Sequence, residues 1–309
     1  MNKIAFIFPG QGAQYVGMAK DFYDAYPIVR ETFEEASKIL SFDFTRLILQ
    51  GPESDLVLTK NSQPAIFIVS VALLRVIQQL YPHLQPAICA GLSLGEYTAL
   101  YASGRLSFAD ALKIVAARGR YMQEACEEQP STMRVVLGLE PEKVAANLPK
   151  DVWIANLNCP GQVVIAGKTA AMPEAEELLK VGGAKRVLPL DVSGAFHTPL
   201  MSSAQAKLKN SLLSVTLNES ATKLVMNVPG DFVDNSSQIR EHLIAQVASP
   251  TQWEKGIRLL EDVDLFIEIG PGKTLTGMNK KIGVKGQTLN IEKTTDLEQL
   301  EKIYATSPR

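Results

Sequence analysis

Ser93, between two glycines in the segment Gly91–Gly95 (GLSLG), has the setting best suited to covalent chemistry. The apolar segment 86–91 before it predicts a short buried strand, and the residues after it predict a helix to about Ala102. Glycines at a tight strand-to-helix turn remove Cβ atoms that would clash, and a helix N-terminus favours developing negative charge. The pattern therefore predicts a nucleophile elbow. The alternative is a chance glycine turn that carries a structural serine.

A serine nucleophile needs a general base, and the sequence contains three histidines. His83 lies in an exposed-looking loop and His242 on a polar helix turn, so both are interpreted as surface residues. His197 lies in a loop of small residues between a predicted strand and a predicted helix. Catalytic groups of α/β proteins commonly lie in such loops. By elimination, His197 is the candidate base.

The group that would orient this imidazole is left open by the residues alone. Asp191 is close to His197 in the chain, but it falls on the preceding predicted strand, where a solvated surface role suits it equally. Other acids are plentiful, so their order along the chain decides nothing. A backbone or side-chain carbonyl could hold the imidazole instead, which would make a Ser–His dyad.

The turn Gly10–Gly12 after the first predicted strand has two interpretations. Its spacing to Gly17 does not follow GxGxxG, and no strand ending in an acid follows about 20 residues later, which argues against a dinucleotide site. An amide at the end of a strand can instead serve as an oxyanion donor.

Arg118 lies midway along a largely apolar predicted helix. An arginine in this position is either a buried ion-pair partner or an anion receptor. The alternative is a structural arginine whose aliphatic stem lies along apolar surface.

Composition bounds the class of protein. The 309 residues suggest two domains or one with an insertion, at about 150 residues per domain. A hydrophobic content of 46% is enough for a large core and argues against a disordered chain. The net charge of −2 argues against a dedicated nucleic-acid binder.

Metal sites and membrane segments are not expected. The cysteines Cys89, Cys126 and Cys159 are far apart, and the histidines show no metal-ligand spacing. The N-terminus shows no targeting signal, and the longest apolar stretch, 65–74, is shorter than the ~18 residues of a membrane span. We therefore expect a cytoplasmic protein, or one from an organelle matrix after loss of a transit peptide.

The predicted elements fall into two units. Strands alternate with helices in residues 1–127 and 196–309, which predicts a mostly parallel sheet covered on both faces. Residues 128–195 contain the order β-α-β-β-α-β, which is typical of a small ferredoxin-like subdomain. The fold class is therefore α/β, with this subdomain inserted into the larger body.

Two helix predictions in the larger body depend on local patterns. Apolar residues at helical spacing predict one helix over residues 17–39. A second, buried helix is predicted over 63–81, with Pro64 near its first turn, where the missing N–H does no harm.

Several motifs together resemble one known family over nearly the whole chain. They are Phe8–Gly12 (FPGQG), Gly91–Tyr97 (GLSLGEY), Arg118–Gly119, Asn158–Gln162 (NCPGQ), Phe196–His197 with Met201, and Ile269–Gly272 (IGPG). In this order they resemble the malonyl-CoA:acyl carrier protein transacylase family of type II fatty acid synthesis. The resemblance implies an α/β-hydrolase-like core with a ferredoxin-like insertion. It also implies malonyl transfer from malonyl-CoA to the phosphopantetheine thiol of the carrier protein through a malonyl-serine, without a metal or a resident cofactor.

The resemblance also implies roles for individual residues. These are Ser93 as nucleophile, His197 as general base and acid, Arg118 as the partner of the malonyl carboxylate, the backbone amides of Gln11 and Leu94 as the oxyanion hole, and the backbone carbonyl of Gln246 as the group that orients the histidine. The expected partners are malonyl-CoA and an acyl carrier protein, with no nucleic acid and no membrane, and the enzyme is expected to be a monomer.

The sequence departs from the family pattern at two places. Leu92 stands where the family often has histidine, and we expect little chemical effect because this residue is not the base. The segment 129–134 replaces a glycine-rich stretch, and Arg134 adds a charge near the subdomain junction.

A docking site for an acidic carrier protein would need a local basic patch, because the chain is net −2. Two clusters are candidates: Lys280, Lys281 and Lys285 after the Gly270–Gly272 loop, and Lys180, Lys185 and Arg186 in the insertion. The first is favoured slightly because it follows a loop at a strand's end, and ordinary solvated lysines are the alternative for both.

Two other functions compete with acyl transfer. A serine esterase or thioesterase would also use Ser93 and His197, but it gives no reason for Arg118 or for the insertion. A nucleotide-binding α/β module would instead be built on Gly10–Gly12.

Overall fold

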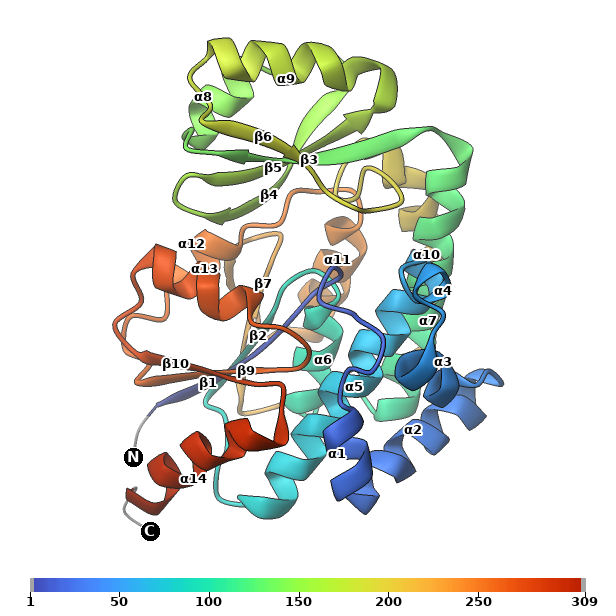
Figure 1. Cartoon of the computed structure of the whole chain (residues 1–309), viewed down its shortest axis with the longest axis vertical. Coiled ribbons are helices and arrows are strands. Elements are labelled where there is room, and N and C mark those ends of the chain that lie inside the picture. The colour runs from blue at the N-terminus through green and yellow to red at the C-terminus, as the bar shows by residue number, and fades with distance from the viewer. Residues whose placement is uncertain (1–2, 307–309) are drawn as a thin grey trace.

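The computed structural model describes residues 3–306 and divides them between a six-stranded and a four-stranded sheet (Figure 1). The larger sheet has the order β10-β9-β1-β2-β7-β8, and its pairs are parallel except for β7 with β8. Its strands are β1 (Ile4–Phe8), β2 (Ile88–Gly91), β7 (Lys223–Met226), β8 (Asp231–Phe232), β9 (Leu265–Ile269) and β10 (Gln287–Ile291). The predicted α/β class with a parallel sheet is confirmed.

The central strands are buried on both faces, which explains their nearly continuous apolar sequences. In β1, Phe6 and Phe8 face one hydrophobic cluster, and Ala5 and Ile7 face another. Successive side chains of a strand point to opposite faces of a sheet. The two clusters therefore lie on opposite sides of the large sheet, as expected when helices cover both faces.

The first cluster is covered by a layer of long helices, and the second by two short ones (Figure 1). The long-helix side includes α2 (Pro27–Leu40), α5 (Thr59–Leu80), α6 (Gly95–Ala102), α7 (Phe108–Glu128), α10 (Ser202–Leu213) and α11 (Ser236–Gln246). The other side carries α12 (Trp253–Arg258) and α13 (Thr274–Ile282). Both faces are thus covered, and the site elements come from the side with the long helices.

Helix α5 has 22 residues and is longer than the helix predicted over 63–81. By length and composition it could cross a membrane, but 78% of its most apolar window is buried inside the protein. It packs mainly against α2 and α7, as a central core helix does.

Two helix predictions were wrong at their boundaries. The segment predicted as one helix over 17–39 forms α1 (Lys20–Ala25) and α2, because Tyr26 precedes Pro27 and takes an extended conformation. Helix α5 begins at Thr59, so Pro64 lies inside the helix rather than in its first turn.

The smaller sheet is antiparallel and has the order β4-β5-β3-β6. Its elements follow the order β-α-β-β-α-β: β3 (Ser131–Leu137), α8 (Pro141–Ala146), β4 (Val152–Cys159), β5 (Gln162–Lys168), α9 (Met172–Val181) and β6 (Arg186–Pro189). A hydrophobic cluster of its own includes Val136, Ile165 and Leu179. Arg134 pairs with Glu176 of α9 at 2.7 Å, so its charge is used within this unit.

The edge strand β4 joins the small sheet to the larger body. The backbone N–H of Leu157 donates to the Thr251 carbonyl at 2.8 Å, and the N–H of Thr251 donates to the Ala155 carbonyl at 2.9 Å. The small sheet is therefore attached directly to the segment that follows α11. Three further helices were not predicted from the sequence: α3 (Phe44–Gln50), α4 (Glu53–Leu56) and α14 (Leu297–Thr306).

Candidate active site

Ser93 lies at the sharp turn between β2 and α6, where two glycines permit close backbone approach. A Cβ atom on Gly91 would lie 2.0 Å from the Gly95 carbonyl carbon, and one on Gly95 would lie 2.1 Å from the Phe8 carbonyl oxygen. Ser93 itself has a φ of 52°, a left-handed conformation that costs a non-glycine residue free energy. This geometry is that of the nucleophile elbow that the GxSxG pattern predicts.

His197 is the histidine that the fold brings to Ser93. Its Nε2 lies 2.8 Å from the Ser93 Oγ, and its Nδ1 lies 2.7 Å from the Gln246 carbonyl oxygen. Because a carbonyl only accepts, the Nδ1 carries the proton and the Nε2 is left to accept from the serine. Of the other two, His83 is exposed and His242 lies half-buried on α11.

The group that contacts the imidazole Nδ1 is a backbone carbonyl and not an acid. Asp191 is exposed, whereas the backbone carbonyl of Gln246 accepts from His197 directly. The arrangement is a Ser–His pair held by a carbonyl, the alternative to a triad that the sequence left open.

The environment of His197 keeps its imidazole neutral. Only 4% of the residue is exposed. Burial, and then the positive charge of Arg118, lower the pKa of His197 to about 4, against a smaller opposing effect of the Gln246 carbonyl. At neutral pH the Nε2 is therefore in the basic form that a proton acceptor requires.

Arg118 reaches the same point from α7. Its Nη2 donates to the Ser93 Oγ and to the Gln246 Oε1, each at 2.9 Å, and its Nη1 donates to the Gln63 Oε1 at 2.7 Å. Within residues 3–306 the Nε has no partner and no carboxylate forms an ion pair with this guanidinium. All the acceptors are neutral and the side chain is 1% exposed, so the buried positive charge is suited to bind an anion.

The two predicted oxyanion donors lie on loops that contact each other. A Cβ atom on Gly10 would lie 2.6 Å from the Leu92 carbonyl oxygen, so the loop that carries Gln11 packs against the elbow that carries Leu94. Neither backbone N–H, of Gln11 or of Leu94, donates a hydrogen bond to another group in the part of the chain that the structure describes. Both amides are thus left without an internal acceptor.

A polar network that was not predicted from the sequence lies beneath the elbow. Asn227 accepts from the Ser93 N–H at 2.6 Å and donates to the Gly91 carbonyl at 2.7 Å. Glu96 accepts from the Asn227 N–H and from the Gln246 Nε2, each at 2.5 Å. Burial raises the pKa of Glu96 to about 8, although both donors and Arg118 lower it.

Only one residue of this network, Glu96, could have been noticed from the sequence. Glu96 is a charged residue in an otherwise uncharged predicted helix, and a carboxylate in such a position is rarely buried without a partner. Asn227 and Gln63 gave no signal, because amide side chains are common at many kinds of position.

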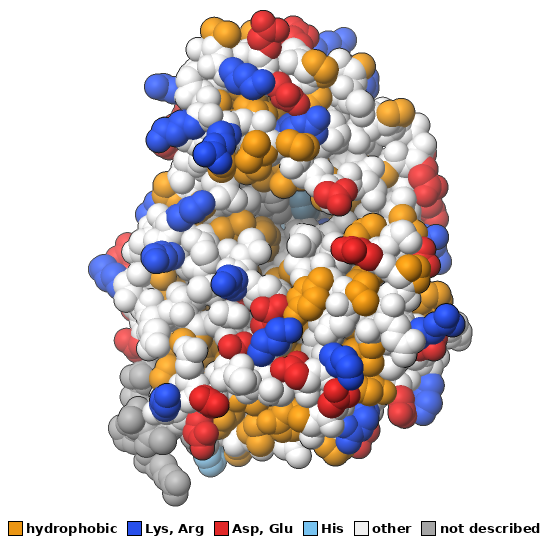
Figure 2. All heavy atoms as spheres, in the orientation of Figure 1, with side chains coloured by type: hydrophobic (Ala, Val, Ile, Leu, Met, Phe, Trp, Pro, Cys, Tyr) orange, Lys and Arg blue, Asp and Glu red, His pale blue; other side chains and the backbone are white. Residues whose placement is uncertain are grey.

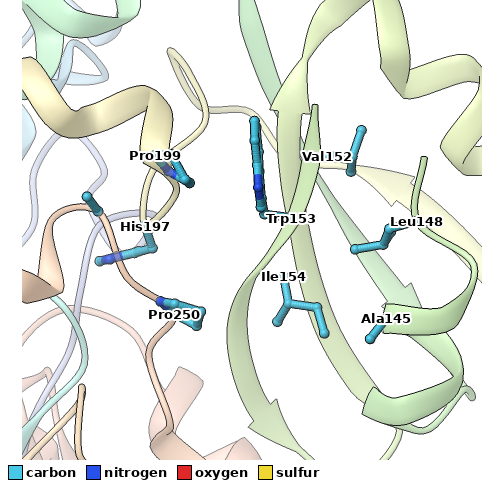
Figure 3. Close-up of a pocket in the computed structure, with 9 residues that line it drawn as sticks. Ala145, Leu148, Val152, Trp153, Ile154, His197, Pro199 and Pro250 are labelled. Carbon is cyan, nitrogen blue, oxygen red and sulfur yellow. The ribbon is translucent and has the colours of Figure 1, made fainter. Parts of the chain in front are cut away.

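A pocket of about 500 Å³ opens between the two units, beside His197 (Figure 3). Leu148, Trp153 and Ile154 line it from the small unit, opposite Pro199 and Pro250 of the larger body. Figure 2 shows the corresponding hollow between the upper and lower parts of this face, with a histidine visible inside. The predominantly apolar walls suit a long chain with few charges that leads to the serine.

Leu92 and the cysteines lie outside this polar arrangement. Leu92 is half-buried and packs against the cluster beneath α12 and α13. Cys89, Cys126 and Cys159 are buried free thiols. Within residues 3–306, no group of three or more His, Cys, Asp or Glu residues could hold a metal ion.

Comparison with known proteins identifies relatives over nearly the whole chain. The acyl transferase domain family matches residues 5–296. The chain is 40% identical over 306 residues to a malonyl CoA-acyl carrier protein transacylase of Bacillus subtilis, with 96% of each chain covered. It is 44% identical over 289 residues to the Escherichia coli K12 protein of the same name, covering 91% of this chain and 93% of that one.

The fold is also similar to that of a solved structure. It is described as a type II PKS acyl-carrier protein in complex with its malonyl-transacylase, and it is 38% identical to this chain with a TM-score of 0.92. The alignment covers 97% of this chain and 99% of that one.

Proposed function

Because this chain belongs to the acyl transferase family, among the malonyl CoA-acyl carrier protein transacylases, we propose that it transfers malonyl groups from malonyl-CoA to the phosphopantetheine thiol of an acyl carrier protein. This reaction supplies malonyl-carrier protein for fatty acid synthesis. One observation carries the assignment: the Ser93 Oγ lies within hydrogen-bond distance of both a neutral His197 and the buried cation of Arg118. A nucleophile, its base and a receptor for a carboxylate therefore meet at one atom.

In the first half-reaction, the Ser93 Oγ attacks the thioester carbon of malonyl-CoA as the His197 Nε2 takes the hydroxyl proton. The C–S bond then breaks, and the imidazolium returns that proton to the leaving CoA sulfur. The amides of Gln11 and Leu94 stabilise the oxyanion of the tetrahedral intermediate, an effect worth about 3 kcal/mol per donor. The product is a malonyl ester on Ser93.

In the second half-reaction, the thiol of the carrier protein loses its proton to His197 and attacks the ester carbon. The serine oxygen leaves and recovers the proton, so the enzyme is regenerated. Every proton transfer uses His197, and we propose that neither a metal nor a resident cofactor is needed. The apolar pocket at His197 disfavours water, which would otherwise hydrolyse the ester.

The role of Arg118 can be tested by its effect on acyl selectivity. Arg118→Ala should lower the rate of Ser93 malonylation by about 100-fold, because charged hydrogen bonds contribute about 3 kcal/mol and each 1.4 kcal/mol is a factor of ten. Acetylation from acetyl-CoA, which has the same thioester but no carboxylate, should fall much less. Single-turnover mass spectrometry would measure both rates. A parallel loss of both would show that Arg118 does not recognise the carboxylate.

The proposed docking surface for the carrier protein is formed by Lys280 and Lys281, in the last turn of α13. Lys281 donates to the Oε1 of Gln162, the first residue of β5, at 3.0 Å, where the two units meet. Lys280 beside it is exposed, whereas Lys285 lies 3.9 Å from Glu261 and its charge is partly offset. Lys and Arg side chains gather along the left of the hollow in Figure 2. An acidic carrier docked there would deliver its arm toward the pocket.

Charge reversal tests this surface. Lys280→Glu with Lys281→Glu should raise the KM for carrier protein about tenfold and leave the KM for malonyl-CoA nearly unchanged, because only the carrier contacts this patch. It should also flatten the salt dependence of the second half-reaction.

The matched control is Lys180→Glu with Lys185→Glu, in the second basic cluster, on α9 and before β6. An equal loss toward both substrates in the α13 variant would mean that these lysines bind CoA phosphates or support the fold.

We further propose that the enzyme acts as a cytoplasmic monomer. This proposal is supported by the site itself, because one chain supplies all the residues assigned to chemistry.

We also propose two domains: a catalytic one made of residues 1–127 and 196–309, and an inserted one made of residues 128–195. The pocket then lies between these two domains.

A further inference from the structure

Glu96 carries a buried carboxyl group, three residues after Ser93, that the acyl-transfer steps do not use. It is 0% exposed and lies on α6. Its Oε2 accepts from the Gln246 Nε2, and its Oε1 accepts from the Asn227 N–H, each at 2.5 Å. Burying a carboxylate is costly, so its retention beneath the elbow calls for a specific purpose.

Gln246 lies between this carboxylate and Arg118. A guanidinium has only donors, so the Gln246 atom that faces it at 2.9 Å must be the amide oxygen. The amide nitrogen then faces two acceptors, the Glu96 Oε2 and, at 2.9 Å, the Ser93 carbonyl oxygen. Only one orientation of the amide satisfies all these groups, and the Glu96 Oε2, at 2.5 Å, is the closer of the two acceptors that enforce it.

We infer that Glu96 is a positioning residue for selectivity: it orients the Gln246 amide, which in turn holds Arg118 in place to receive the acyl carboxylate. The inference rests on the proposed function and extends it to a residue that touches neither substrate nor reacting atom. If the amide turned over, its NH₂ group would face the guanidinium, and two donors would meet. Arg118 would then move away from the position that it shares with the Ser93 Oγ.

The test variant is Glu96→Gln, which keeps the shape but replaces one acceptor oxygen by an NH₂ donor. That group must then face either the Gln246 Nε2 or the Asn227 N–H, both of which are donors. Disturbing Asn227 affects the Ser93 N–H and slows every acyl donor, whereas turning the Gln246 side-chain amide displaces Arg118, which slows mainly the carboxylated donor. We therefore expect the ratio of malonylation to acetylation rates to fall at least about tenfold, in single-turnover reactions of the full chain with malonyl-CoA and acetyl-CoA.

The matched control is Glu268→Gln. Glu268 is also 0% exposed, but its carboxylate accepts from the N–H groups of Leu275 and Thr276 at the start of α13. This control should lower the melting temperature as Glu96→Gln does and leave the selectivity ratio unchanged. A drop in the ratio that followed melting temperature in both variants would overturn the inference.

A double-mutant cycle tests the route through Gln246. In a Gln246→Met background, Glu96→Gln should leave the selectivity ratio within about twofold, since the orienting contact is already gone. If Glu96→Gln alone leaves the ratio at the wild-type value, or lowers it equally in the Met background, Glu96 does not act through Gln246. Wild-type protein that formed no malonyl-enzyme would instead contradict the proposed function, so the two failures are distinguishable.

Discussion

Ser93→Ala should abolish the malonyl-enzyme and lower the overall transfer rate by a factor on the order of 10⁴ or more. The Ser93 hydroxyl lies between His197 and Arg118, and alanine at the elbow leaves the guanidinium of Arg118 in place. Substrate binding should therefore survive while acylation stops. Rapid-quench measurement of labelled malonyl-enzyme would show this directly.

Ser237→Ala is the matched control, because Ser237 is an exposed serine near the start of α11. It should retain the wild-type acylation rate. Malonylation of the Ser93→Ala protein at the wild-type rate would refute the assignment of the nucleophile.

The second large effect is expected at His197. His197→Ala should lower the acylation rate by about 10³-fold to 10⁴-fold, because general-base catalysis contributes up to that much and within residues 3–306 His197 is the base that contacts the serine. Loss of the imidazole also removes the contact that orients the Oγ. Stopped-flow acylation with malonyl-CoA measures the change, and circular dichroism checks that the fold is kept.

His83→Ala and His242→Ala are the controls, since these side chains lie in an exposed turn and on α11. Both should stay within about threefold of the wild type, as surface substitutions usually do. If His242→Ala were as damaging as His197→Ala, the elimination among the histidines would be wrong.

The elbow could be predicted from sequence because its constraints are local. Gly91 and Gly95 lie four residues apart, and both are required because the backbone passes too close for a Cβ atom, so a short sequence pattern can reveal them. His197 emerged by elimination, and the position of Gln246 followed only from the family resemblance. In the folded chain, its carbonyl meets an imidazole 49 residues away in sequence.

The support beneath the elbow could not be predicted because it depends on tertiary contacts. Glu96 and Gln246 are 150 residues apart, and Ser93 and Asn227 are 134 apart. Nothing in the local pattern of either partner specifies such a pair. The side-chain amides of Gln246 and Asn227 become part of the site only in the folded chain, where they contact the backbone of Ser93.

Local rules also explain the boundary errors in the fold. Helical spacing continues across Tyr26, but the steric effect of Pro27 ends the first helix there. Strand β10 was missed because its half-buried sequence, Gln287–Ile291, carries little apolar signal and lies at a sheet edge. It is recruited to the sheet by pairing with β9 over its whole length.

The central claim is that Ser93 carries the malonyl group between two thiols. The direct test is intact-protein mass spectrometry after mixing with malonyl-CoA alone, followed by peptide mapping and then by addition of carrier protein bearing phosphopantetheine. We predict one malonyl group per chain, located on the peptide that contains Ser93, stable without carrier and lost to the carrier thiol when it is added. Unmodified protein with free malonate accumulating, or a label on another residue, would contradict the account.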